Sequence, residues 1–176
     1  MFVLSTEGTN TEPQYFSMFN DDRTVVHVKL LRPRSPAPEA VLGEMKRYLR
    51  QEDLRTSDAA WLVVDKDHWT DVQLQSLYEW SLTDDRYGLA VSNPLFEYWL
   101  LLHFENGNRI ASAKQCINRL RRYLPGQDKN LQIAPLRTHV AEAVSRAERR
   151  DSPPCQDWPR RSGTTVYRLV KDLIDE

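Results

Sequence analysis

Acidic residues stand where two apolar stretches of the chain end. Glu7 follows the stretch 2–6, and Asp65 and Asp67 follow the stretch 59–64. Both stretches are typical of buried strands. The carboxyl ends of parallel strands meet at one edge of a sheet, which is where open α/β sheets bind ligands. We therefore expect these three carboxylates to converge at that edge.

A fourth carboxylate, Glu12, falls in the first turn of the helix expected after the first strand, so it can reach the same edge. Mg²⁺ prefers hard oxygen ligands, and carboxylates crowded together repel each other unless a cation lies between them. The residues thus predict a Mg²⁺ site, with Mn²⁺ as the alternative ion. The metal ligands expected are Glu7, Glu12, Asp65 and Asp67. Taken singly, each could instead be a turn residue or could complement a helix dipole.

Three further polar residues are expected near this edge in a supporting role. Glu97 interrupts an otherwise apolar helix, and a buried carboxylate is costly unless it is paired or hydrogen-bonded. Asn93 precedes Pro94, so it could cap that helix or contact phosphate. His68 follows the acidic pair and could carry a proton near neutral pH. The structural alternatives are a satisfied core carboxylate, a simple helix cap and a surface histidine.

The hydrophobic pattern predicts an α/β fold with a parallel four-stranded sheet, because strands alternate with helices along the first hundred residues. Right-handed crossovers would then place helices on both faces of this sheet. The predicted strands are 2–6, 24–31, 59–64 and 87–91. The predicted helices are 11–21, 39–51, 71–82, 95–104, 111–124, 133–149 and 164–174. We expect residues 1–104 to form the α/β core and residues 105–176 a helical C-terminal extension that packs on it.

Local signals predict where some helices begin. Thr11 is expected to cap the first helix, with Gln14 completing a capping box. Asn93 and Pro94 form a cap followed by a proline in the first turn. Thr164 or Thr165 is expected to cap the last helix.

The composition is that of an ordinary globular protein: 176 residues, 40% hydrophobic and 28% charged. No apolar run is long enough to cross a bilayer and no signal peptide is recognisable, so the expectations are no membrane association and a cytoplasmic location. Cys116 and Cys155 are far apart and form no zinc spacing with the four histidines. Two reduced structural thiols are expected.

The net charge of −1 does not indicate nucleic-acid binding, but arginines are frequent after about residue 109. An acidic site beside a basic surface suits a metal-dependent phosphodiesterase. Arg119 and Arg122 are three residues apart and share a helix face, with Lys114 nearby. These three are the expected nucleic-acid contacts. The alternative is a hydrated or partner-facing surface.

Four specific segments extend over almost the whole chain: EGTNTEPQYF (7–16), WLVVDKDHW (61–69), AVSNPLFEYWLLLHF (90–104) and GTTVYRLV (163–170). In these segments the chain resembles the RloB family of the Toprim superfamily. The resemblance implies a Toprim-like (Rossmann-like) fold and Mg²⁺-dependent phosphodiester cleavage. It implies catalytic metal chemistry at Glu7, Asp65 and Asp67, and Glu12 is similar to the second glutamate of OLD-type nucleases.

The resemblance also implies a catalytic lysine, for which Lys129 is the preferred candidate and Lys114 the second. RloB-like proteins occur beside ATPases in bacterial anti-phage or abortive-infection systems, so a partner ATPase and a DNA or RNA substrate are implied. Two other functions stay open: a nucleic-acid-binding or sensor subunit without turnover, and phosphotransfer on small molecules. Self-association into a homo-oligomer is also left open.

Overall fold

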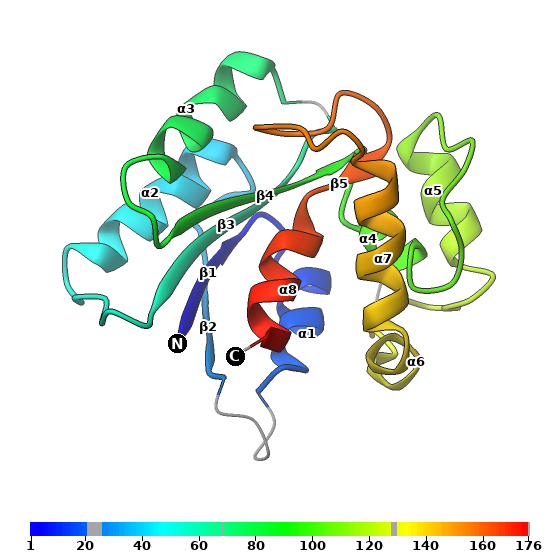
Figure 1. The fold of residues 1–176 in the computed structure, drawn as a ribbon, viewed down its shortest axis with the longest axis horizontal. Helices are drawn as coiled ribbons and strands as arrows, with labels where there is room; N and C mark the ends of the chain where they lie inside the picture. Colours follow the sequence, from blue (N-terminus) through cyan, green and yellow to red (C-terminus); the bar gives the residue numbers. More distant parts are fainter. Residues whose placement is uncertain (21–25, 68, 128–129, 176) are drawn as a thin grey trace.

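The computed structural model describes residues 1–20, 26–67, 69–127 and 130–175, which form an α/β fold (Figure 1). Its sheet has the strand order β2-β1-β3-β4-β5. The strands are β1 (Phe2–Thr6), β2 (Val28–Leu31), β3 (Ala59–Asp65), β4 (Tyr87–Asn93) and β5 (Gly163–Thr164). The first four pair in parallel, as predicted, and β5 pairs antiparallel with β4. The sheet is therefore mixed and five-stranded in the described residues, where four parallel strands were expected.

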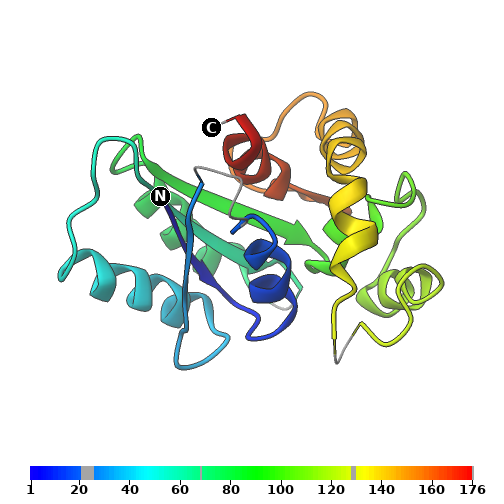
Figure 2. The same ribbon diagram turned by 90° about the horizontal axis from the view of Figure 1, so that it is seen from below.

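Helices cover both faces of the sheet, as right-handed crossovers require (Figures 1 and 2). On one face lie α2 (Pro38–Leu49) and α3 (Asp71–Ser81), and on the other lie α1 (Thr11–Ser17) and α8 (Val166–Asp175). Beyond the carboxyl end of β4 follow the remaining helices. They are α4 (Glu97–Leu101), α5 (Ala113–Leu120), α6 (Ile133–Thr138) and α7 (Val140–Arg150).

Successive side chains of each strand point to opposite faces of the sheet, so the hydrophobic core has two parts. In β1, Val3 faces the side of α2 and α3, whereas its neighbours Phe2 and Leu4 face the side of α1 and α8. All three are buried. Because both faces are covered, β1, β3 and β4 read largely as apolar runs, which is why their positions could be predicted; the edge strand β2 contains the exposed Lys29 and is shorter than the predicted stretch 24–31.

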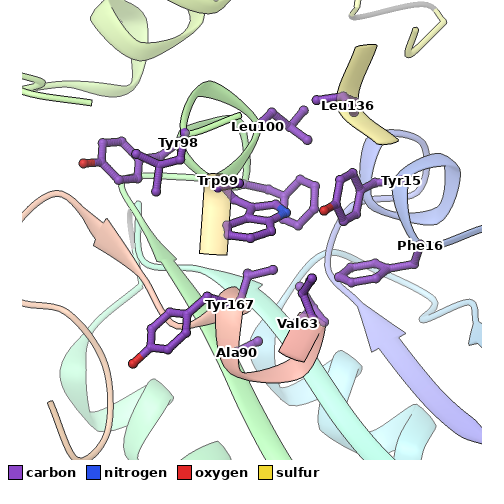
Figure 3. Close-up of a cluster of buried hydrophobic side chains, with 14 of the residues drawn as sticks. Tyr15, Phe16, Val63, Ala90, Tyr98, Trp99, Leu100, Leu136 and Tyr167 are labelled. Atoms are coloured by element: carbon purple, nitrogen blue, oxygen red, sulfur yellow. The ribbon is translucent and has the colours of Figure 1, made fainter. Parts of the chain in front are cut away.

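An aromatic cluster joins α1 to α4 on the second face (Figure 3). The ring of Tyr15 packs edge-on against Phe16, Phe96 and Trp99, with centroid separations of 5.2, 5.6 and 6.1 Å. The Tyr15 hydroxyl lies 3.2 Å from Nε2 of His103, and both side chains are buried. Each such ring pair adds about 1 kcal/mol beyond the burial of its area. This cluster fixes α4, and therefore Glu97 in its first turn, against the start of α1.

Two predicted helix caps are wrong, although α1 does begin at Thr11. Asn10, not Thr11, precedes α1, and no side chain caps it; Gln14 instead donates to Oδ1 of Asn10 and accepts from the N–H of Leu131. Asn93 does not cap a helix, because it extends β4 and donates its side-chain amide to the carbonyl of Pro159. The next helix begins only at Glu97.

The C-terminal region differs from its expected pattern at two points. The predicted helix 133–149 is two helices separated at His139, whose backbone leaves the helical conformation at φ −113° and ψ 19°. Residues 163–164 form β5 instead of starting the last helix, because they find partners in β4, with Thr164 opposite Ser92. No helix of the described residues is long and apolar enough to cross a membrane.

Candidate functional site

The candidate site lies between β1 and β3, where the chain leaves two adjacent central strands in opposite directions. After β1 the chain enters α1 on one face, and after β3 it continues to α3 on the other. Ligands in open α/β sheets bind at such a switch point, beyond the carboxyl ends of the strands. Glu7 is the first residue after β1, and Asp65 is the last residue of β3.

Glu7 is held across these two strand ends. Its Oε2 accepts a hydrogen bond of 2.9 Å from the backbone N–H of Asp65, and its Oε1 accepts one of 2.9 Å from the indole Nε1–H of Trp69. Its own N–H donates to the carbonyl of Val63, which continues the ladder between β1 and β3. The expected meeting of Glu7 with the end of the third strand therefore occurs.

Glu12 lies in the first turn of α1 and is only 5% exposed. Its Oε1 accepts a 3.0 Å hydrogen bond from the backbone N–H of Gly8. A Cβ atom at position 8 would lie 1.9 Å from Oε2 of Glu12, so the carboxylate can approach only because residue 8 is glycine. Burial raises the pKa of Glu12 to about 7, and the negative charges of Glu97 and Glu7 also raise it.

Asp65 is half-buried at the centre of the same group. Burial is the main cause that raises its pKa well above the usual range, followed by the charges of Glu12, Glu7 and Glu97. Glu97, which we expected only as a supporting residue, is thus one of four carboxylates that repel each other at this edge. We call Glu7, Glu12, Asp65 and Glu97 the acidic edge.

The carboxylate oxygens of the acidic edge are ligands that suit a hard divalent cation, but the side chains are not arranged around a common metal position. Among the described residues, no group of three or more His, Cys, Asp or Glu side chains has an arrangement that could hold a metal ion. A physical reason is visible: Glu7 and Glu12 are turned toward N–H donors of the protein. A carboxylate oxygen has two lone pairs, so these bonds leave capacity for a cation.

Asp67 and Lys66 lie just beyond the end of β3. Asp67 is exposed, and its N–H donates to the carbonyl of Pro94. Lys66, between the two aspartates, is directed toward α3, where it donates to the Trp69 carbonyl at 2.6 Å and pairs with Asp71 at 3.1 Å. His68 and Lys129 lie outside the described residues.

The three expected nucleic-acid contacts line one open hollow of about 570 Å³ on α5. Lys114 and Arg122 are exposed there. Arg119 instead forms an ion pair with Glu105, which lines the same hollow, and donates to the carbonyl of Asn108. The pair neutralises one of the three positive charges of this surface.

Two residues of the site were missed from the sequence. Trp69 positions Glu7 through its indole, and Gly8 positions Glu12 through its N–H. A glycine directly after a strand-end glutamate is a detectable signal for a close backbone approach. Nothing local marks Trp69, because its partner is 62 residues away.

These features define an α/β protein whose parallel strands carry a cluster of carboxylates at their carboxyl ends. The chain belongs to the family of RloB-like proteins, whose family model matches residues 2–173. Searches of curated proteins and of solved structures found no match.

Proposed function

We propose that the chain is a Mg²⁺-dependent, Toprim-like nuclease that cleaves phosphodiester bonds of DNA or RNA. The observation that carries this proposal is the acidic edge, where four carboxylates lie close enough at a switch point of the sheet for their charges to raise the pKa values of Glu12 and Asp65. Like charges confined in this way are stabilised by a cation, which makes a divalent ion the natural occupant. Family membership supports the further proposal of a role in anti-phage or abortive-infection defence beside a partner ATPase, in the cytoplasm.

Asp65 and Glu12 would hold the ion, with Glu7 and Glu97 completing its surroundings and the exposed Asp67 available to a second ion or to a bound water. When bound, Mg²⁺ polarises a phosphoryl oxygen and lowers the pKa of a coordinated water. The protein itself orients Glu7, through hydrogen bonds from the N–H of Asp65 and from the indole N–H of Trp69. The raised pKa values of Glu12 and Asp65 mean that cation binding is coupled to proton release from both groups.

The test is cleavage of labelled DNA and RNA by the purified protein, alone and with its ATPase, in Mg²⁺, Mn²⁺ or EDTA. We expect cleavage in either metal and none in EDTA, and we expect Asp65→Asn and Glu7→Gln to lower the rate at least about 100-fold. Glu52→Gln is the matched control, because Glu52 is exposed just beyond α2 and its substitution removes one carboxylate away from the acidic edge. Equal cleavage by the wild type and both edge variants would exclude the assigned site.

One observation favours a second function, a nucleic-acid-binding or sensor subunit without turnover. The carboxylates of the described residues are not arranged as metal ligands, and Glu7 and Glu12 are engaged by the protein's own donors. This function predicts nucleic-acid binding that is indifferent to Mg²⁺ and to Asp65→Asn. The cleavage assay and a binding assay on the same preparations separate the two functions.

A further inference from the structure

A second hollow, of about 480 Å³, lies between α7, the loop that follows α4 and the segment before β5. Four arginines line it: Arg146, Arg149, Arg150 and Arg161. Arg149 and Arg150 follow Arg146 by three and four residues, which places them beside it on α7. Asn106, Asn108 and Ser162 supply the rest of the lining, so it contains no acidic side chain.

The positive charge of this hollow is not neutralised by the neighbouring carboxylates. Each acidic residue next to the hollow in the sequence is paired with another cation: Glu105 with Arg119, Glu148 with Lys171, and Asp151 with Arg168. Unpaired cations gathered in one depression attract an anion much more strongly than scattered surface charges do.

Neutral oxygen atoms hold two of the arginines in place. Arg146 donates to the carbonyls of Leu102 and His103 at 2.7 and 2.9 Å, and Arg150 donates to Oδ1 of Asn108 at 2.8 Å and to the carbonyl of Ser162 at 3.2 Å. The Nε of Arg150 is buried and has no hydrogen-bond partner in the described part of the chain. The guanidinium groups are therefore positioned but keep their charge.

The hollow is close to the acidic edge. Ser162 directly precedes Gly163, which pairs with Asn93 at the end of β4, and the neighbouring Ser92 is opposite Asp65 of β3. Adjacent strands are about 4.8 Å apart, so the backbones of Asp65 and Thr164, which are both opposite Ser92, are separated by two strand spacings, or roughly 10 Å. A chain bound in the hollow can thus extend to the carboxylates.

We infer that this hollow binds the phosphate backbone of a nucleic-acid strand. Arginine recognises phosphate through paired, charge-assisted hydrogen bonds, and four arginines in an open depression suit a polyanion better than a single small anion. The identification of the bound strand as the substrate rests on the proposed nuclease function. The binding site itself requires no metal.

The test is fluorescence anisotropy of labelled single-stranded and double-stranded oligonucleotides with the full chain in EDTA, over a series of NaCl concentrations. The double variant Arg149→Ala/Arg161→Ala is chosen because both side chains are exposed and neither holds a helix end. We expect affinity at low salt to fall about 10-fold or more, and the slope of log K against log[NaCl] to lose about 1.4 to 1.8 for two lost phosphate contacts. The pair Arg149→Lys/Arg161→Lys keeps the charge and is expected to keep most of the slope.

Arg50→Ala is the control for loss of positive charge elsewhere on the surface, because Arg50 is exposed at the end of α2 on the other face of the sheet; it removes one charge, compared with two in the alanine pair. The inference is overturned if the alanine pair binds like the wild type, if Arg50→Ala weakens binding equally, or if the wild type binds neither oligonucleotide, which would indicate an acidic protein partner instead. Cleavage in Mg²⁺ is scored separately. If the wild type binds the oligonucleotides but does not cleave them, the nuclease proposal is refuted, whereas the assignment of the hollow as a binding site is not affected.

Discussion

The backbone N–H of Asp65 donates a 2.9 Å hydrogen bond to Oε2 of Glu7, a residue 58 positions earlier in the chain. Through this bond the end of β3 orients the carboxylate that follows β1. The donor belongs to the backbone, so replacing the Asp65 side chain leaves the bond in place. The contributions of the two carboxylates can therefore be separated by substitution.

Asp65→Asn should remove the central charge of the acidic edge while preserving its shape. Because burial, and after it the charges of Glu12, Glu7 and Glu97, oppose ionisation of Asp65, we expect the free energy of unfolding at pH 8 in EDTA to rise. Mg²⁺ should raise the melting temperature of the wild type and not that of the variant, because only the wild type keeps the central ligand. Chemical denaturation and thermal melts check both statements, and an equal Mg²⁺ effect on the two proteins would contradict the assignment.

Stability should depend on pH through Glu12. Its pKa is about 7 in the folded protein and 4.5 for an unperturbed glutamate, as in the unfolded chain, so the folded state binds the proton more tightly. The resulting stabilisation is fully present below pH 4.5 and is lost as the pH rises through 7, by an amount on the order of 3 kcal/mol. Asp65 shifts stability in the same direction. Urea unfolding from pH 4 to 8 in EDTA should show this loss, and Glu12→Gln should flatten it; a curve unchanged by the substitution would contradict the assigned pKa.

Gly8→Ala should disturb the site. The new Cβ would lie 1.9 Å from Glu12 Oε2, so the carboxylate must leave its hydrogen bond with the N–H of residue 8. We expect the free energy of unfolding to fall by about 1 kcal/mol, the contribution of the lost hydrogen bond, because the end of the Glu12 side chain can move away from the new methyl group. Gly43→Ala is the matched control, because nothing lies within 4 Å of its Cβ position in the middle of α2. That change should stabilise the protein by about 0.5–1 kcal/mol, and equal effects at the two glycines would refute the close approach.

Trp69→Phe should weaken the positioning of Glu7, because phenylalanine keeps an aromatic ring and removes the indole N–H that donates to Oε1. A hydrogen bond to a charged group contributes about 1.5–3 kcal/mol, and the half-buried position of Trp69 places the expected loss at the lower end. If the chain cleaves nucleic acid, the Mg²⁺ concentration required for half-maximal rate should rise severalfold. The control is Trp61→Phe, because Trp61 is also half-buried and the substitution is the same.

The elements that could be predicted are those with a local signal. Residues 2–6 and 59–64 are apolar and appear as β1 and β3, and the amphipathic stretch 71–82 appears as α3, which begins after a capping box at Thr70. The hydrophobic pattern is enough to predict these elements, because the apolar residues of each one are buried in the core. The convergence of Glu7 with Asp65 followed from the same reasoning.

The features that escaped prediction depend on distant partners. Residues 163–164 become a strand only because β4 offers its edge, about 70 positions earlier in the chain. Glu97 joins the acidic edge because aromatic packing between α1 and α4 places its helix there. Asn93 is a residue type that often caps helices, but here it pairs with Gly163 of β5 and ends β4. In each case tertiary contacts outweigh the local preference.

The segment around β5 also covers the end of β4. An open strand edge is a template on which another copy can add its own strand. Along the end of β4 that template is already used: the N–H of Val91 donates to Oγ1 of Thr165, the N–H of Thr165 donates to the carbonyl of Val91, and Gly163 pairs with Asn93. The end of β4 beside the acidic edge is therefore not available for pairing with a strand of another molecule.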